Sequence, residues 1–304
     1  MTRRIIRKLL IANRGEIACR ISRTARALGI ATVAVYSDAD SDALHVQQAD
    51  EARRIGGAAA AESYLNSAAI IEAARQTGAD AIHPGYGFLA ENANFAQAVI
   101  DAGLIFVGPT PEAIAAMGKK REAKLLLRDV PLVPGYQDAD QSDDIMQAAA
   151  EAIGYPVMVK ASAGGGGKGM RRVASATALP DALATARREA RQAFGDDTLI
   201  LEKYLDNPRH IEIQIVGDTH GNVQAVGERE CSIQRRHQKI IEETPSTAVD
   251  RELREKMAAT AVSIGQQLGY VGAGTVEFLL DAEGRYYFME MNTRLQVEHP
   301  VTEM

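Results

Sequence analysis

Strand-like and helix-like segments alternate through the first 115 residues of the chain. Short runs rich in Leu, Ile, Val and Ala are each followed by a stretch with helical periodicity. Because parallel strands need a crossover between them, usually a helix, this alternation predicts a doubly wound parallel sheet. The predicted strands lie at 8–13, 31–37, 80–83 and 104–108, and the predicted helices end near Leu28 and cover 67–77 and 91–102.

Two loops follow predicted strands at the edge of the sheet where ligands usually bind. They are residues 13–16 (Asn-Arg-Gly-Glu) and 83–88 (His-Pro-Gly-Tyr-Gly-Phe). Ligands of such sheets lie outside the carboxyl ends of the strands. The first loop lacks the G-x-G-x-x-G pattern that lets a backbone approach a pyrophosphate closely. A dinucleotide oxidoreductase is therefore disfavoured.

The rest of the chain mixes strands and helices without strict alternation, which predicts an α+β arrangement. We expect a turn-rich linker from Pro131 to Asp144. The predicted elements are helices at 111–128, 143–153, 178–194 and 250–268, and strands at 157–161, 170–174, 198–204, 209–217 and 222–230.

The chain closes with two strand-like segments, at 274–280 and 286–292, which are joined by a polar stretch typical of a hairpin turn. A turn centred on residues 283–284 places Glu277 opposite Glu290. Carboxylates placed directly opposite each other destabilise a strand pair. A divalent cation held between them removes that penalty.

Glu277 and Glu290, with the amide oxygen of Asn292, are therefore candidate metal ligands. An oxygen-only set of this kind is the one that Mg²⁺ or Mn²⁺ uses beside nucleotide phosphates. An amphipathic hairpin with a solvated acidic face is the alternative interpretation.

Polar residues occupy every even position from 290 to 298. Along an extended chain, alternate side chains share one face. A carboxylate, an amide, a guanidinium, an amide and a carboxylate would then lie together, a set that suits a metal-bound phosphate beside a small anion. These residues are Glu290, Asn292, Arg294, Gln296 and Glu298.

A glycine-rich loop joins the strands predicted at 157–161 and 170–174. Its four successive glycines, 164–167, let backbone N–H groups approach a bulky anion, and Lys160 and Lys168 flank them. The spacing is not that of a Walker A motif, and a strand rather than a helix follows. We interpret the loop as a phosphate contact, with a flexible surface hairpin as the alternative.

A segment rich in charged and polar side chains follows the strand predicted at 222–230. Residues 228–239 combine Arg, Gln, His and Lys with Glu. A solvated charge run is the common explanation, but this mixture suits recognition of a polyphosphate or a carboxylate. His210 and His237 are candidate phosphate or ribose contacts.

Composition narrows the class of protein. With 304 residues and 46% hydrophobic content, the chain can form two or three domains with a sizeable core. The net charge of −6 argues against a general nucleic-acid binder. Two distant cysteines, Cys19 and Cys231, fit a reducing compartment, and no apolar run approaches the length of a membrane span. We therefore expect a cytoplasmic protein that binds neither nucleic acid nor membrane.

Taken together, these motifs resemble the ATP-grasp family and, within it, the biotin carboxylases. The resemblance extends over essentially the whole chain. Other ATP-grasp ligases, such as carbamoyl phosphate synthetase, share the glycine loop and the paired metal carboxylates, but differ after Asn292. The segments that carry the resemblance are 11–18, 83–89, 160–170, 234–239 and 290–303.

The resemblance implies a reaction. ATP and bicarbonate would give carboxyphosphate and ADP, with Mg²⁺ or Mn²⁺ as the metal, and the carboxyl group would then pass to biotin on a carrier protein or domain. It also implies a carboxyltransferase partner and a homodimer. The chain is more similar to the α subunits of acyl-CoA carboxylases than to a stand-alone acetyl-CoA system.

The resemblance also implies a domain division. Residues 1–115 would form the Rossmann-like amino-terminal domain and 116–304 the ATP-grasp domain, with a lid at about 132–204. Members of the family continue well past the position of Met304, so the chain is expected to be truncated before a final domain. A nucleotide-binding fragment without turnover and another ATP-grasp carboxylate ligase are the alternatives.

Site residues follow from the matching positions. The residues assigned to ATP are Lys120 and Lys160 at the phosphates, the Gly165 and Gly166 backbone in a mobile lid, Glu202, Lys203 and Leu205 at the adenine edge, partly through backbone, and His210, Gln234 and His237 at the ribose and phosphates. The remaining roles fall to Glu277, Glu290 and Asn292 as metal ligands, Lys239, Arg294, Gln296 and the Val297 backbone as bicarbonate ligands, and Glu298 as the base.

Overall fold

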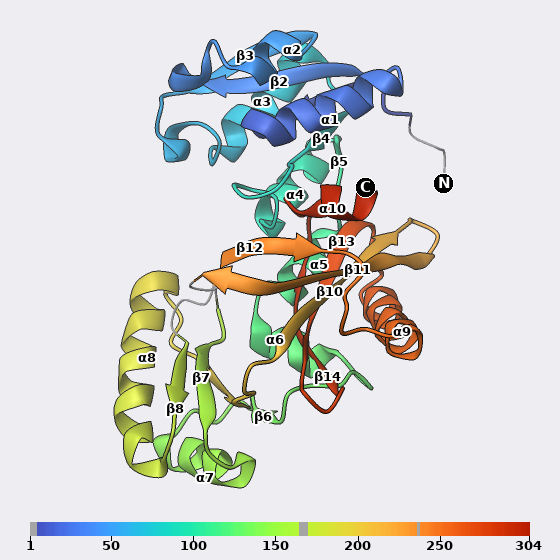
Figure 1. The fold of residues 1–304 in the computed structure, drawn as a ribbon. Helices are drawn as coiled ribbons and strands as arrows, with labels where there is room; N and C mark the ends of the chain where they lie inside the picture. Colours follow the sequence, from blue (N-terminus) through green and yellow to red (C-terminus); the bar gives the residue numbers. More distant parts are fainter. Residues whose placement is uncertain (1–4, 164–169, 236–237) are drawn as a thin grey trace.

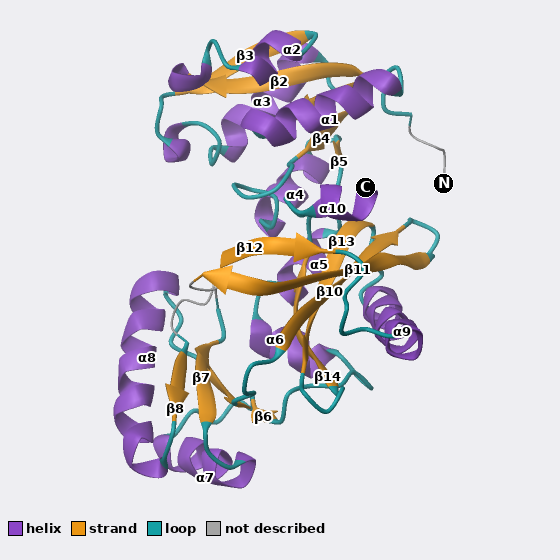
Figure 2. Ribbon diagram, in the orientation of Figure 1, coloured by secondary structure: helices purple, strands orange, loops and turns teal. Residues whose placement is uncertain are grey.

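The computed structural model describes residues 5–163, 170–235 and 238–304, so the predictions on Gly165, Gly166 and His237 lie outside the described residues. Three sheets organise the described chain. Figure 1 shows the amino-terminal sheet at one end of the molecule, a long antiparallel sheet in the middle, and a smaller sheet at the other end. Helices flank each of the three (Figure 2).

The first sheet is parallel and has the order β3-β2-β1-β4-β5, which confirms the predicted doubly wound fold. Side chains of α1 pack on one face, and side chains of α3 and α4 pack on the other. Its elements are β1 (Lys8–Ile11), α1 (Gly15–Ala27), β2 (Ala31–Ser37), α2 (Leu44–Gln48), β3 (Glu51–Gly56), α3 (Ser67–Thr77), β4 (Ala81–His83), α4 (Ala93–Asp101) and β5 (Ile105–Phe106).

The sequence did not predict β3. This strand reads Glu-Ala-Arg-Arg-Ile-Gly, and only its Ile55 is buried. It lies at the edge of the sheet, where one side is open and charged residues are tolerated. Hydrophobic periodicity therefore gives no signal for it.

The smaller sheet has the order β6-β9-β7-β8, and the helices α7 and α8 pack on it around their own apolar core. It corresponds in position to the lid expected at about 132–204. The predicted linker contains one of its strands, the short β6. The elements are β6 (Gly135–Tyr136), α7 (Asp143–Ile153), β7 (Val157–Ala161), β8 (Arg171–Val173), α8 (Leu179–Phe194) and β9 (Leu199–Lys203).

The long antiparallel sheet has the order β12-β11-β10-β13-β14. One face covers the largest core cluster together with α9. The sequence did not predict β12, and β11 runs further than the strand expected at 222–230. The elements are β10 (Arg209–Gly217), β11 (Val223–Arg235), β12 (Gln238–Glu243), α9 (Arg251–Gln267), β13 (Gly272–Leu280), β14 (Tyr286–Asn292) and α10 (His299–Glu303).

The helix predicted at 111–128 is in fact two helices, α5 (Pro111–Met117) and α6 (Lys120–Leu126), separated by Gly118 and Lys119. The domain boundary expected at residue 115 therefore falls inside α5. Ile114 of α5 packs in the core of the parallel sheet, whereas Ala113 and Met117 pack in the core of the long antiparallel sheet. One short helix thus belongs to both cores. Among the described residues, no helix is long and apolar enough to cross a membrane.

Candidate functional site

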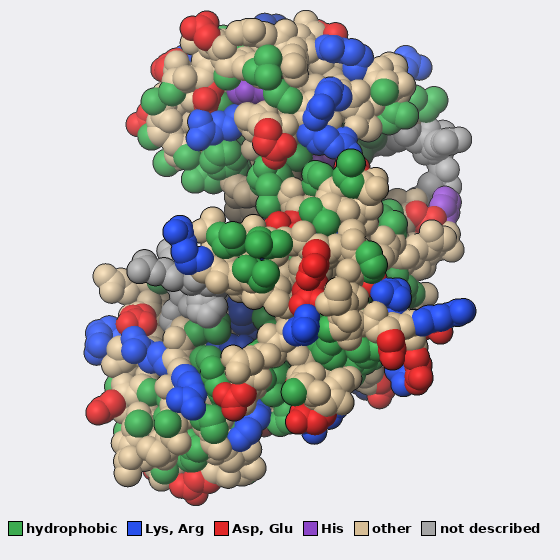
Figure 3. All heavy atoms as spheres, in the orientation of Figure 1, with side chains coloured by type: hydrophobic (Ala, Val, Ile, Leu, Met, Phe, Trp, Pro, Cys, Tyr) green, Lys and Arg blue, Asp and Glu red, His purple; other side chains and the backbone are tan. Residues whose placement is uncertain are grey.

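A cleft of about 910 Å³ lies between the lid and the long antiparallel sheet, with the loop after β4 at its rim. In the space-filling view the surface is hollowed beside the lid, next to a group of apolar side chains over β12 (Figure 3). Every predicted site residue that the structure describes lines this cleft. These residues are Lys120, Lys160, Glu202, Lys203, Leu205, His210, Gln234, Lys239, Glu277, Glu290, Asn292, Arg294, Gln296, Val297 and Glu298.

Lys239 lies at the centre of the acidic end of the cleft. Its Nζ donates to a carboxylate oxygen of Glu212 at 2.6 Å, of Glu298 at 2.7 Å and of Glu277 at 2.9 Å. Burial disfavours the ammonium form, but the three carboxylates outweigh it and raise the pKa of Lys239. A permanently charged cation is therefore fixed between three buried acids.

Glu212, which the sequence analysis did not single out, is fully buried and joins Lys239 to a second cation. Its other oxygen accepts from Arg229 Nε at 2.5 Å, and Arg229 also donates to Thr302 of α10 at 2.7 Å. A signal was present in the sequence, since His210, Glu212 and Gln214 are alternate residues of a predicted strand. Alternate side chains of a strand share one face, so these three polar residues lie together.

His210 lies on the same strand, with Nε2 2.9 Å from a Glu277 oxygen and Nδ1 2.8 Å from the side-chain nitrogen of Gln234. Burial lowers the pKa of His210, but the Glu277 carboxylate outweighs burial and raises it above its ordinary value. The structure thus brings His210 and Gln234 together at the wall of the cleft.

The register of the closing hairpin confirms that Glu277 faces Glu290, although the path to that pairing differs from the prediction. Leu280 pairs with Tyr286 and Phe278 with Phe288, so the turn is centred on residue 283 rather than between 283 and 284. A β-bulge then shifts the register by one residue before Glu277. The two deviations cancel, and the carboxylates meet.

Glu290 is the member of this pair whose ionised form is disfavoured. Burial and the neighbouring Glu277 carboxylate raise its pKa, while Lys120, with Nζ 3.5 Å from a Glu290 oxygen, acts in the opposite direction. Glu277, in contrast, has its pKa lowered, because hydrogen bonds from His210 and Lys239 outweigh burial. An additional cation beside Glu290 would favour its ionised form, which is the behaviour of a metal ligand.

The third predicted ligand, Asn292, donates its amide nitrogen to Glu277 at 2.7 Å, and its oxygen lies 3.4 Å from an Arg294 nitrogen. Two further groups of potential ligands share the region, one of which is His210, Glu212 and Glu277. The other combines Glu212 and Glu298 with the thiol of Cys231. Lys239 pairs with Glu212, Glu298 and Glu277 alike. Glu290 is not among its partners and has a raised pKa, so the Glu290 carboxylate, with Glu277 facing it, would gain most from a divalent ion.

Replacing Glu290 by Gln should leave the melting temperature in metal-free buffer unchanged or raise it. The folded-state pKa of Glu290 lies above its unfolded value, so its ionisation destabilises the fold as pH rises, and Gln removes that cost. Turnover with Mg²⁺ and ATP should fall at least roughly 10–100-fold. Thermal unfolding with EDTA at pH 8, together with ADP release against Mg²⁺ concentration, tests both; a large loss of melting temperature contradicts the facing-carboxylate argument.

The extended chain predicted through residue 298 ends at Asn292, where β14 ends. Residues 293–298 form a bend and a turn that leads into α10, so strand alternation does not place Arg294, Gln296 and Glu298. Their side chains nevertheless converge on the cleft. In the amide orientation that satisfies both of its neighbours, the Gln296 side chain accepts from the Asn292 nitrogen at 2.9 Å and donates to the Glu298 carboxylate.

The lid side of the cleft carries a second buried ionic group. The Glu202 carboxylate hydrogen-bonds to the ammonium groups of both Lys160 and Lys124. Burial alone would raise the pKa of Glu202, but the two lysines lower it to about 2. The side chain of Glu202 thus holds Lys160, which leaves its backbone for the expected contact with an adenine edge. Lys124 was missed, although it lies four residues after Lys120 on a predicted helix, the spacing of a shared face.

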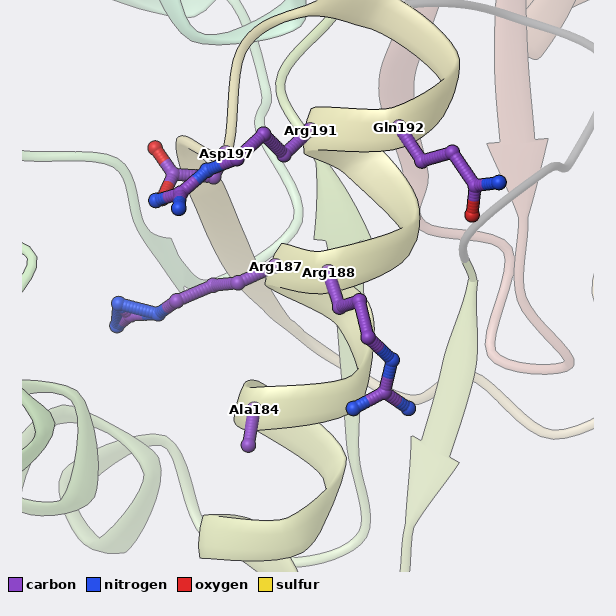
Figure 4. A pocket seen from close by; sticks show the side chains of 6 residues that line it. All are labelled: Ala184, Arg187, Arg188, Arg191, Gln192 and Asp197. Atoms are coloured by element: carbon purple, nitrogen blue, oxygen red, sulfur yellow. The ribbon is translucent and has the colours of Figure 1, made fainter.

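A second hollow, of about 480 Å³, lies on the outer face of α8. Figure 4 shows Arg187, Arg188 and Arg191 projecting from this helix. Two of them form ion pairs, Arg187 with Asp143 at 3.1 Å and Arg191 with Asp197. The hollow contains none of the predicted site residues and no buried acid, so we place the functional site in the larger cleft.

Two family models together match most of the chain. Residues 5–114 match the family model described as the biotin carboxylase N-terminal domain. Residues 119–304 match the model described as the carbamoyl-phosphate synthase L chain, ATP binding domain.

Three similar proteins illustrate the relationship. The chain is 58% identical to the mitochondrial methylcrotonoyl-CoA carboxylase subunit alpha of Arabidopsis thaliana, over 98% of this chain and 41% of that protein. It is 55% identical to biotin carboxylase 1 of Bacillus subtilis, over 99% and 67%. The crystal structure of the biotin carboxylase domain dimer of Hydrogenobacter thermophilus 2-oxoglutarate carboxylase, with MgADP, ADP and bicarbonate, matches with a TM-score of 0.94 and 48% identity, over 99% and 67%. The chain thus spans less than half the length of the plant relative.

Proposed function

Because the chain belongs to the biotin carboxylase family, we propose that the full-length protein carboxylates biotin on a carrier, using ATP and bicarbonate. The observation that carries the proposal is the acidic end of the cleft. There Lys239 is bound by Glu298 and Glu277, next to the Arg294 guanidinium. Two cations and one carboxylate beside a metal-binding pair suit a small anion that must be deprotonated and phosphorylated.

The anion site follows from the charges. Bicarbonate is a weak nucleophile, and its transfer reaction depends on positioning and on neutralising the charges brought together. In our proposal Lys239 and Arg294 bind its oxygens, with Gln296 and the Val297 backbone as further ligands. Glu298, 2.7 Å from Lys239, takes the proton.

The phosphate site combines three parts of the chain. Lys120 begins α6, and its backbone N–H donates to the carbonyl of Ser162 at 3.0 Å, directly before the glycine loop. The ammonium group of Lys160 forms a buried ion pair with Glu202 at the wall of the cleft. We propose that both lysines contact ATP phosphates and that Glu277, Glu290 and Asn292 hold Mg²⁺. A bound Mg²⁺ would neutralise charge on the phosphate oxygens.

The remaining assignments are also proposals. The crystallised relative from Hydrogenobacter thermophilus is described as a dimer, which supports a homodimer here. The acyl-CoA carboxylase α subunits among the relatives support a biotin carrier and a carboxyltransferase as partners. We propose a cytoplasmic location, which the two free cysteines, Cys19 and Cys231, support, although several relatives are mitochondrial.

The test is ADP release by the full-length protein with Mg²⁺ and ATP, with and without bicarbonate and free biotin. The proposal expects a rate that depends on both additives and that is lost in the Arg294→Ala variant. Hydrolysis that ignores both additives would retain the ATP-grasp fold and point to another carboxylate substrate. ATP binding without turnover would support a nucleotide-binding module instead.

A further inference from the structure

Glu91, from the amino-terminal part of the chain, reaches the candidate anion site. One carboxylate oxygen accepts from the backbone N–H of Thr293 at 3.1 Å, and the other accepts from Arg294 Nε at 2.8 Å. About 200 residues of sequence separate these partners. Thr293 follows the end of β14, so its N–H lacks a strand partner there and finds one in Glu91.

The loop that carries Glu91 is fixed by several independent contacts. The buried Asn13 side chain donates to the carbonyls of Pro84 at 2.8 Å and Tyr86 at 2.7 Å. Gly85, with φ of +65°, lies so close that an added Cβ would be 2.8 Å from the Asn13 nitrogen. These contacts restrict the backbone conformation of residues 84–86 and of the loop that continues to Glu91.

Phe88 gives the same loop a second anchor. It has φ of +36°, which is rare for a residue with a side chain, and its ring stacks on Tyr64 with centroids 5.0 Å apart. The buried Tyr64 hydroxyl donates to Asp40 at 2.7 Å. The loop that carries Glu91 is thus held in one conformation by contacts with Asn13 and Tyr64.

The two contacts of Glu91 decide which way the guanidinium faces. One of them engages Arg294 at its Nε edge. Of the terminal nitrogens, Nη1 donates to the carbonyl of Leu295 at 3.2 Å, and Nη2 lies 3.4 Å from the Asn292 oxygen, a weak contact that is easily replaced. Arg294 lines the cleft, so its terminal nitrogens, and Nη2 above all, are the part of the fork that a planar anion there would meet.

We propose that Glu91 is a positioning residue for the anion site: it clamps Arg294 by its Nε edge, so that the two terminal nitrogens are presented to bicarbonate. The proposal rests on the proposed function. It also makes the amino-terminal part of the chain a contributor to bicarbonate affinity. The exposed fractions of the Glu91 and Arg294 side chains are 40% and 22%, so the pair contributes little to folding stability, and its effect is one of orientation.

The experiment uses the full-length protein and compares Glu91→Gln with the wild type and with a control, Glu72→Gln, an exposed acid on α3. Gln can still accept from Thr293, but its amide nitrogen opposes the Arg294 Nε–H, so the clamp is lost at nearly constant shape. We expect the KM for bicarbonate to rise about tenfold, with the KM for ATP and the melting temperature unchanged. The control should match the wild type in all three.

A second set of variants separates orientation from general disturbance. Lysine has no Nε–H edge, so in an Arg294→Lys background Glu91→Gln should change the KM for bicarbonate by less than about twofold. A bicarbonate KM within about twofold of the wild type in the single variant overturns the proposal, as does an equal rise of both KM values or a lowered melting temperature. A wild-type rate that is indifferent to bicarbonate overturns the proposed function instead.

Discussion

Replacing Glu298 by Gln should lower bicarbonate-dependent ADP release roughly 10²–10⁴-fold, the range expected when a general base is removed. The side chain is buried, and its carboxylate accepts from Lys239 at 2.7 Å, so Gln keeps the shape and one acceptor oxygen but cannot take the proton. Lys239 retains the Glu212 and Glu277 carboxylates, and the melting temperature should change little. Initial rates and thermal unfolding of the same preparation measure both.

The matched control is Glu303→Gln, an acid on α10 five residues further along. Its carboxylate pairs with Arg20 at the surface and does not line the cleft. It should retain the wild-type rate. A Glu298→Gln enzyme with a rate within tenfold of the wild type would remove Glu298 from the role of base.

Replacing Lys239 by Met should affect both activity and stability. The change removes one of the two proposed anion-binding cations, and it leaves Glu212, Glu277 and Glu298 buried without their shared partner. Breaking a buried ion pair from one side costs roughly 3–5 kcal/mol of unfolding free energy. Bicarbonate-dependent ADP release should fall to the level of the Arg294→Ala variant.

The stability loss should depend on pH. Lys239 contributes to the lowered pKa of Glu277, and a carboxyl whose folded pKa is depressed contributes stability above its unfolded value, near 4.5, that is lost as pH falls. Without Lys239 the Glu277 carboxyl loses part of the stabilisation of its ionised form. The stability difference between wild type and variant should therefore be largest above about pH 5 and narrow as the pH falls from 4.5 towards 2, as measured by urea unfolding.

Lys256→Met provides the control for this series, since Lys256 pairs with Glu252 on the exposed face of α9. An exposed i,i+4 pair contributes little, and the variant should unfold like the wild type at each pH. An equal loss of stability in both lysine variants, or a difference that widens on acidification, would contradict the buried three-carboxylate arrangement.

The hairpin shows how a sequence prediction can be confirmed by a different route. The pairing of Glu277 with Glu290 was inferred from a regular hairpin with its turn centred between residues 283 and 284. In the structure the turn is centred on residue 283, and a β-bulge restores the pairing. Bulges leave no reliable mark in a single sequence, because they arise from packing across the sheet. The facing of the two carboxylates was predictable from residue types and spacing, whereas the position of the turn and the bulge that produce it were not.

Residue types and periodicity were sufficient for the parallel sheet and for most helices and strands of the lid, and a family resemblance supplied the residues that line the cleft. Local pattern carries that information because burial imposes a period on each element. The tertiary structure alone decided how distant elements meet. It placed Lys239 among acids from three separate segments, gave Glu202 two lysine partners, and brought Glu91 to Arg294. These contacts depend on packing over tens to hundreds of residues, and no local period encodes such separations.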